Sequence, residues 1–289
     1  MYKYILILTI ALLSIQCQSD DQSSNETTSI ATLETAYEEN PSGENLQALL
    51  DAYVADSTGQ YLEKQAYLQL SNNRFREGLP ALKKLMKGSL KAKHALALAA
   101  AYEQQQNQAA AQTAYQAYLL TFPKDDQAAA ITQRLPQGIP PVAERLAALF
   151  EDTKDDSLRR AEPKIVSHYV ASAEALALIA PQTDSVSVHL KQAANFTQHY
   201  LRDIPRALDL YLWIVNNYQG TPEHEVALFT TAFVYDDEVE DIETARQYYE
   251  RFIQQYPTSD FADDAEVLLS NLGKDDAEIL EELLRKQQG

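Results

Sequence analysis

The sequence contains little cysteine, glycine or tryptophan: its 289 residues include one cysteine, Cys17, together with 8 glycines and one tryptophan. One cysteine cannot form a disulfide within the chain, so packing has to stabilise the fold. The 8 glycines leave little material for loops that hold phosphate groups, and the sequence has no phosphate-binding, dinucleotide-binding or nucleophilic-serine motif. These absences argue against a disulfide-rich domain and against the common nucleotide-binding loops.

Positive charge is also scarce. Lysine and arginine total 24 against 42 aspartate and glutamate residues, which gives a net charge of -18. A chain this acidic repels nucleic acid and anionic lipid surfaces. The charge therefore predicts no binding to nucleic acid and favours a partner of basic character or a polar polymer.

The histidines show no metal-ligand pattern. No two of them have the spacing that places two ligands on one helix face, and no second cysteine is present to complete a zinc site. They are His94, His168, His189, His199 and His224. We expect each to be a surface or packing residue.

An acidic stretch, residues 236–241, carries five carboxylates in six positions. It lacks the glycine of an EF-hand calcium loop, so we interpret it as a solvated turn. With no catalytic constellation in the sequence, we predict no catalytic residue, no metal and no cofactor, and a protein that is not an enzyme. An enzyme built on a helical frame is the alternative that these absences oppose.

Helix-forming residues dominate the chain. Its composition is 45% hydrophobic, with runs of alanine, glutamine, glutamate and leucine. It has almost none of the alternating β-branched segments that strands require. The sequence therefore predicts an all-α fold.

Residues 92–123 show how the helices are expected to pair. The regularly spaced residues of this stretch are Ala95, Leu98, Ala99, Tyr102, Ala111, Tyr115, Tyr118 and Pro123. Leu98 and Tyr102 lie one turn apart on a first helix, and the later residues share one face of a second, so each helix carries an apolar stripe toward its partner. Small residues at Ala99 and Ala111 allow the backbones to approach closely, and Pro123 ends the second helix.

This pattern resembles the tetratricopeptide repeat, whose helix pairs use large, small and aromatic residues at these offsets. Three more stretches resemble it, at 228–257, 190–214 and 62–85. The resemblance implies tetratricopeptide-like antiparallel helix pairs stacked in a right-handed α-solenoid, in which each repeat buries its face against its neighbours. A long amphipathic helix over 163–180 is expected to pack between two blocks of repeats.

The N-terminus begins with an apolar run from Tyr4 to Ile15, followed by Cys17. The run is too short for a membrane span of about 20 residues and is typical of a signal segment. A lone cysteine at this position resembles the lipid-attachment site of bacterial lipoproteins, in particular Bacteroidota envelope lipoproteins. The resemblance implies a lipid on Cys17 and attachment to the bacterial outer membrane, at its periplasmic or its surface face. A cleaved secretory signal with an incidental cysteine and an uncleaved anchor are the alternatives.

Changes in composition predict five segments. They are a lipoprotein-type signal peptide at 1–16, a disordered tether at 17–29, N-terminal helical repeats at 30–135, a breaker and connector at 136–160, and C-terminal helical repeats with a capping helix at 161–289. The breaker is rich in proline and glycine, which interrupt regular structure. The final helix, 276–286, is expected to cover the exposed face of the last repeat.

In tetratricopeptide repeats the first helix of each pair lines a concave groove. Carried over to the matching positions of this chain, the resemblance assigns a partner groove to Lys191, Asn195, Gln198, His199, Phe229, Phe233, Asp236 and Asp237. It implies a lipid-anchored envelope scaffold that binds a protein or peptide, as part of an envelope complex. The alternative is a glycan or nutrient-capture accessory lipoprotein; such proteins use aromatic platforms, whereas Trp213 is the single tryptophan here.

Overall fold

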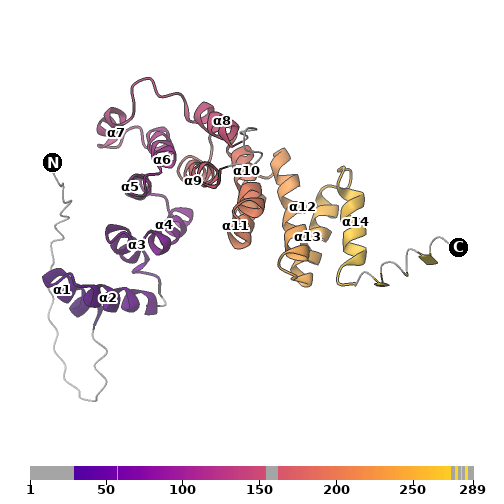
Figure 1. Cartoon of the computed structure of the whole chain (residues 1–289), viewed down its shortest axis with the longest axis horizontal. Helices are drawn as coiled ribbons and strands as arrows, with labels where there is room; N and C mark the ends of the chain where they lie inside the picture. The colour runs from indigo at the N-terminus through magenta and orange to yellow at the C-terminus, as the bar shows by residue number, and fades with distance from the viewer. Residues whose placement is uncertain are drawn as a thin grey trace, which may run out of the picture. The chain divides into compact units, whose positions relative to one another are not determined.

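The computed structural model describes residues 29–56, 58–153 and 162–274, together with residues 277, 278, 281, 284 and 285. These described residues form fourteen α-helices and no strand, so the predicted all-α fold is confirmed (Figure 1). The chain divides into two compact units between Ala55 and Asp56. The predicted signal peptide, most of the tether, and Cys17 lie outside the described residues.

The first unit contains α1 (Ile30–Glu39) and α2 (Gly43–Ala55), which pack against each other. Ser29 caps α1, because its side chain accepts a hydrogen bond from the backbone nitrogen of Thr32 at 3.2 Å. Leu50 of α2 is buried, and the Tyr53 hydroxyl donates to Glu34 Oε1 of α1 at 2.7 Å. Asn45 Nδ2 of α2 also donates to the carbonyl oxygen of Ala36 in α1 at 3.1 Å, so the pair is held by apolar packing and by hydrogen bonds between the helices.

The second unit contains the other twelve assigned helices. They are α3 (Leu62–Ser71), α4 (Phe75–Gly88), α5 (Ala92–Gln104), α6 (Gln108–Thr121), α7 (Ala128–Arg134), α8 (Val142–Asp152), α9 (Pro163–Ile179), α10 (Val186–His199), α11 (Ile204–Asn217), α12 (Pro222–Asp237), α13 (Ile242–Gln255) and α14 (Ala262–Asn271). Helices α3 and α4, α5 and α6, α10 and α11, and α12 and α13 pack as pairs. These pairs coincide with the four predicted repeats, which confirms the tetratricopeptide-like helix-pair architecture.

The turns inside these four pairs share one backbone feature. A residue in the left-handed region precedes the second helix of each pair: Asn73 (φ 60°), Gln106 (φ 59°), Arg202 (φ 56°) and Glu240 (φ 59°). In three of the pairs the next residue then caps that helix with its side chain, as Asn107 does by accepting from the backbone nitrogen of Ala110 at 3.1 Å. The repeats therefore share a turn geometry as well as a side-chain pattern.

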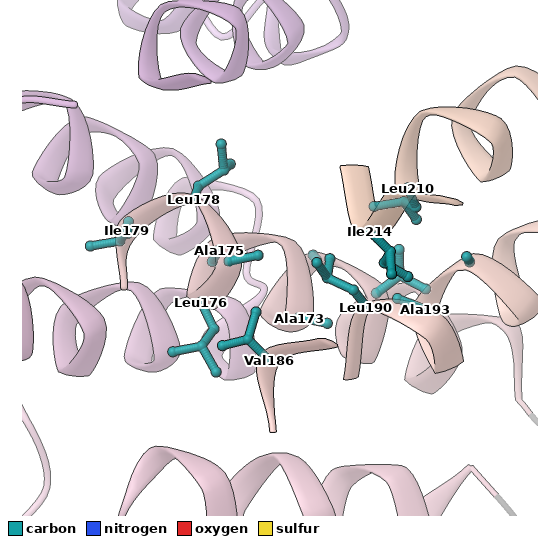
Figure 2. Close-up of a cluster of buried hydrophobic side chains, with 14 of the residues drawn as sticks. Ala173, Ala175, Leu176, Leu178, Ile179, Val186, Leu190, Ala193, Leu210 and Ile214 are labelled. Carbon is teal, nitrogen blue, oxygen red and sulfur yellow. The ribbon is translucent and has the colours of Figure 1, made fainter. Parts of the chain in front are cut away.

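Helix α9 lies between the helix pairs that precede and follow it, packed against α6 and α10, as the sequence predicts (Figure 1). Every residue from Tyr169 to Ile179 is buried. The sequence predicts an amphipathic helix here, but the middle of α9 is buried on every side and almost entirely apolar, so other elements have to enclose it; α8 also packs against it. Figure 2 shows Leu176 of α9 beside Val186 of α10, with Leu210 and Ile214 of α11 in the same buried cluster.

The predicted connector, 136–160, includes the short helix α8, and its residues 154–160 lie outside the described part of the chain. Because α6 and α9 pack together, the repeats before and after the connector belong to the same compact unit. The predicted domain bounds themselves stay a prediction. The capping helix predicted for 276–286 lies mostly outside the described residues.

Among the helices that the structure describes, none combines the length and the apolar composition needed to cross a membrane.

Candidate functional site

The predicted partner groove falls on α10 and α12, two helices that contact each other. On α10, Lys191 and Asn195 are half-buried and His199 is exposed. Gln198 departs from the prediction, because it is only 3% exposed. It faces the interior of the repeat and is not part of an accessible surface.

Tyr211 of α11 explains the position of Gln198. Its hydroxyl lies 2.7 Å from Asn195 Oδ1 and 3.1 Å from Gln198 Oε1, close enough to donate to either oxygen. Burial raises the pKa of Tyr211, so the hydroxyl keeps its proton and remains a donor. Both amide side chains therefore help to hold α10 against α11, and Asn195 has this structural contact in addition to its predicted groove position.

On α12, Phe229 is half-buried in an aromatic cluster. Its ring stacks on Phe261 at a centroid distance of 5.1 Å and lies 5.4 Å from Phe252 and 6.3 Å from Tyr249. Phe252 and Tyr249 belong to α13, and Phe261 directly precedes α14. Phe229 thus packs against the following helices, which limits the part of its ring that is accessible to a partner.

Phe233, one turn further along α12, is 38% exposed. Asp236 is half-buried and accepts a hydrogen bond from the Tyr249 hydroxyl at 3.3 Å, whereas Asp237 is exposed. Burial raises the pKa of Asp236, and the neighbouring charge of Asp237 adds to this effect. The accessible end of α12 therefore presents an aromatic ring beside a carboxylate.

The acidic stretch 236–241 is not wholly a solvated turn as predicted, because Asp236 and Asp237 belong to α12 and Asp241 also has a structural role. Asp241 caps α13: its side chain accepts from the backbone nitrogen of Thr244 at 3.1 Å and from the Thr244 hydroxyl at 2.7 Å. These bonds lower the pKa of Asp241. Within the described residues, no group of three or more histidine, cysteine or acidic side chains is arranged to hold a metal ion.

Three of the histidines are buried and hydrogen-bonded: His94, whose Nε2 lies 3.1 Å from Glu63 Oε2, and His189 and His224. His189 Nδ1 lies 2.8 Å from the Tyr169 hydroxyl, and His224 Nε2 lies 3.1 Å from the carbonyl oxygen of Val215. Burial lowers the pKa of His189 and of His224. These three histidines are packing residues, as the sequence predicts.

A buried charged centre was not predicted from the sequence. Glu174, in the middle of α9, is 5% exposed. Its carboxylate accepts from Arg206 of α11, with Nε 3.0 Å from Oε1 and Nη2 2.7 Å from Oε2, and also from the Lys83 ammonium of α4. The only sequence signal was that Glu174 is the single acidic residue between Glu162 and Asp184, in a segment that is otherwise almost entirely apolar.

The two cations determine the charge state of Glu174. Burial alone would raise its pKa, but the charges of Lys83 and Arg206 and their hydrogen bonds lower it to about 2. The carboxylate raises the pKa of Lys83 and of Arg206 despite their partial burial. All three groups are therefore charged at neutral pH, and they connect α4, α9 and α11 as one ion network.

Comparison with known families agrees with this geometry at one repeat. The tetratricopeptide repeat model matches residues 226–259, which cover most of α12 and all of α13. The chain therefore contains a tetratricopeptide repeat, and repeats of this kind generally mediate binding between proteins. Searches of curated proteins and of solved structures gave no significant match.

Proposed function

We propose that this protein is a lipid-anchored scaffold of the bacterial cell envelope that binds a protein or peptide through the exposed faces of α10 and α12. The observation that carries the binding role is the tetratricopeptide repeat at 226–259, set in a chain whose neighbouring helices pair in the same way. A stack of such pairs offers a long surface to an extended partner.

Contacts inside the repeats reduce the number of predicted groove residues that a partner can reach. Gln198 is buried and Phe229 packs in an aromatic cluster, so the accessible members are Lys191, His199, Phe233 and Asp237, with Asn195 at the edge. Exposed aromatic residues are frequent anchors of protein interfaces. Phe233 is therefore the proposed anchor, and the charged residues form a polar rim around it.

The proposed outer-membrane location rests on the sequence pattern at Cys17. A lipid on this cysteine would tether the repeats, and the acidic charge of the chain would keep them away from anionic lipid. The protein would then act by binding rather than by catalysis. The compartment in which the partner is found would show whether the protein lies on the periplasmic or the surface face of the outer membrane.

Cys17→Ser is expected to move the protein from the membrane fraction to the soluble envelope fraction, because it removes the thiol that would carry the lipid. Fractionation followed by immunoblotting measures the distribution, and circular dichroism should show unchanged helicity. Ser19→Ala, in the same polar segment, is the matched control and should stay with the membrane. A Cys17→Ser protein that remains fully membrane-bound would exclude the lipoprotein assignment.

Combined replacement of Lys191 and Phe233 by alanine is expected to weaken capture of the partner by at least about 10-fold, because both side chains lie on the proposed surface. The free energy of unfolding of this double variant should change by only about 1 kcal/mol or less, because Phe233 is exposed and Lys191 only half-buried. The measurement is affinity capture from solubilised envelopes with quantitative mass spectrometry of the retained proteins.

Val267→Ala is the control for that experiment, because Val267 is an exposed apolar residue of α14 outside the proposed surface. It should leave capture unchanged. Equal capture by the double variant and the wild type would place the partner on another face of the repeats.

A further inference from the structure

A hollow of about 610 Å³ lies where the C-terminal ends of α4 and α9 meet α11. Its lining includes two buried apolar residues, Met86 and Leu178. Its volume is in the range of sites for small molecules, which is about 300–1,000 Å³. None of its lining residues belongs to the proposed partner surface, so a ligand bound here would not occupy that surface.

Trp213 of α11 forms one wall of this hollow. The Lys87 ammonium lies over its indole ring, 4.7 Å from the ring centroid. Lys87 is exposed, and no carboxylate of the described residues forms an ion pair with it. The negative face of an indole attracts a cation, and it attracts the electropositive C–H groups of a sugar ring for the same reason. An exposed lysine side chain can leave this face to a ligand at little cost.

The lining also includes polar residues. Gln182, Asn216 and Asn217 are exposed and carry amides, and Asp209 carries a carboxylate. Asn217 uses its amide nitrogen on the carbonyl oxygen of Trp213 at 2.8 Å, which leaves its amide oxygen for a ligand. Amides both donate and accept hydrogen bonds, as the hydroxyl groups of a saccharide do.

The charges of the lining residues indicate the charge of the ligand. Lys87 and Asp209 are the two charged side chains of the lining, and they have opposite signs. The chain as a whole carries -18, which disfavours approach by an acidic peptide. A neutral ligand with many hydroxyl groups fits this lining better than an anionic one.

We propose that this hollow is a binding site for a short neutral oligosaccharide. One sugar ring stacks on Trp213 after Lys87 moves aside, and the amides of Gln182, Asn216 and Asn217 bond its hydroxyl groups. Trp213 would then serve as the aromatic platform on which glycan-binding proteins depend. The site acts independently of the protein-binding surface.

Trp213 also provides the measurement, because it is the only tryptophan of the chain. The full chain is titrated with chitotriose, cellotriose and maltotriose while tryptophan fluorescence is recorded. We expect a saturable change with at least one of these trisaccharides. Asn216→Ala should weaken that response about 5-fold through loss of a hydrogen bond, and Gln219→Ala, an exposed residue outside the lining, should not.

Lys87→Ala separates a saccharide from a peptide ligand. If the ammonium only covers the ring face, its removal should leave saccharide affinity unchanged or increase it by about 2- to 5-fold. The same titration is run with a blocked tripeptide of glutamate, leucine and aspartate. A saturable response to that peptide that disappears in Lys87→Ala would overturn the proposal, since the hollow would then be an anion-binding peptide site.

Absence of any saccharide response, or a response that Asn216→Ala does not alter, would also overturn it. The Lys191 and Phe233 double variant should keep the saccharide response in full. Failure of the saccharide site is therefore distinguishable from failure of the protein-binding surface.

Discussion

Glu174→Gln is expected to lower the free energy of unfolding by about 3–5 kcal/mol, the largest effect of any single change considered for this chain. The substitution preserves the shape of the side chain but leaves the cations of Lys83 and Arg206 without their buried counter-charge. Breaking one side of a buried ion network costs about this much, because an uncompensated charge remains away from water. Urea unfolding followed by circular dichroism measures the loss.

The matched control replaces all three members, Lys83, Glu174 and Arg206, with methionine. This triple variant removes every charge together, so it should lose far less stability than Glu174→Gln despite carrying more substitutions. A loss below about 1 kcal/mol for Glu174→Gln would show that water reaches the network in solution.

The same network predicts a dependence on pH. Glu174 has a folded pKa of about 2 against an ordinary value of 4.5. Because folding lowers this pKa, the stability that the carboxylate contributes is fully present above pH 4.5 and is lost as the pH falls toward 2. The difference in unfolding free energy between the wild type and Glu174→Gln should therefore shrink across that interval and be constant near neutrality.

Phe229→Ala is expected to cost about 3 kcal/mol of unfolding free energy. The ring packs on Phe252 and Phe261, and its removal leaves a cavity and breaks an aromatic stack. Phe233→Ala, one turn away on the same helix and 38% exposed, is the matched control and should cost less than about 1 kcal/mol. The two variants are compared by denaturant unfolding.

Partner capture gives the second part of this test. Phe233→Ala should weaken capture while the protein remains folded. Phe229→Ala should affect capture only through loss of folded protein, so its binding should recover at low temperature. If the two variants were equally stable, Phe229 would have to be assigned to the binding surface instead of the core.

The helix pairs could be predicted from sequence because their determinants are local. Leu98 and Tyr102, or Ala245 and Tyr249, lie one turn apart, so their spacing identifies both the helix and its buried face. Proline residues such as Pro123 mark where a helix has to end. Such signals need no knowledge of the neighbouring repeat.

The accessible surface was harder to predict. Gln198 has the spacing of a groove residue, but the Tyr211 hydroxyl of the next helix lies 3.1 Å from its side-chain oxygen. Phe229 also has the spacing of a groove residue, but the ring of Phe261, more than thirty residues later in the sequence, stacks on it. Both outcomes depend on contacts between helices, which a repeat pattern does not specify. The Glu174 network was missed for this reason as well, since its partners are 91 and 32 residues away in sequence.

The enclosure of α9 determines which helices of the protein unfold together. In a simple array a terminal repeat can unfold by itself at the cost of its one interface with a neighbour. Here α9 is packed by α6, α8 and α10 and joined through Glu174 to α4 and α11. Loss of any of these helices would expose the middle of α9, so α4, α6, α8, α9, α10 and α11 form one cooperative unit. Amide hydrogens of α9 should then exchange only through opening of that whole unit, while α14, at the end of the described stack, exchanges by local fraying.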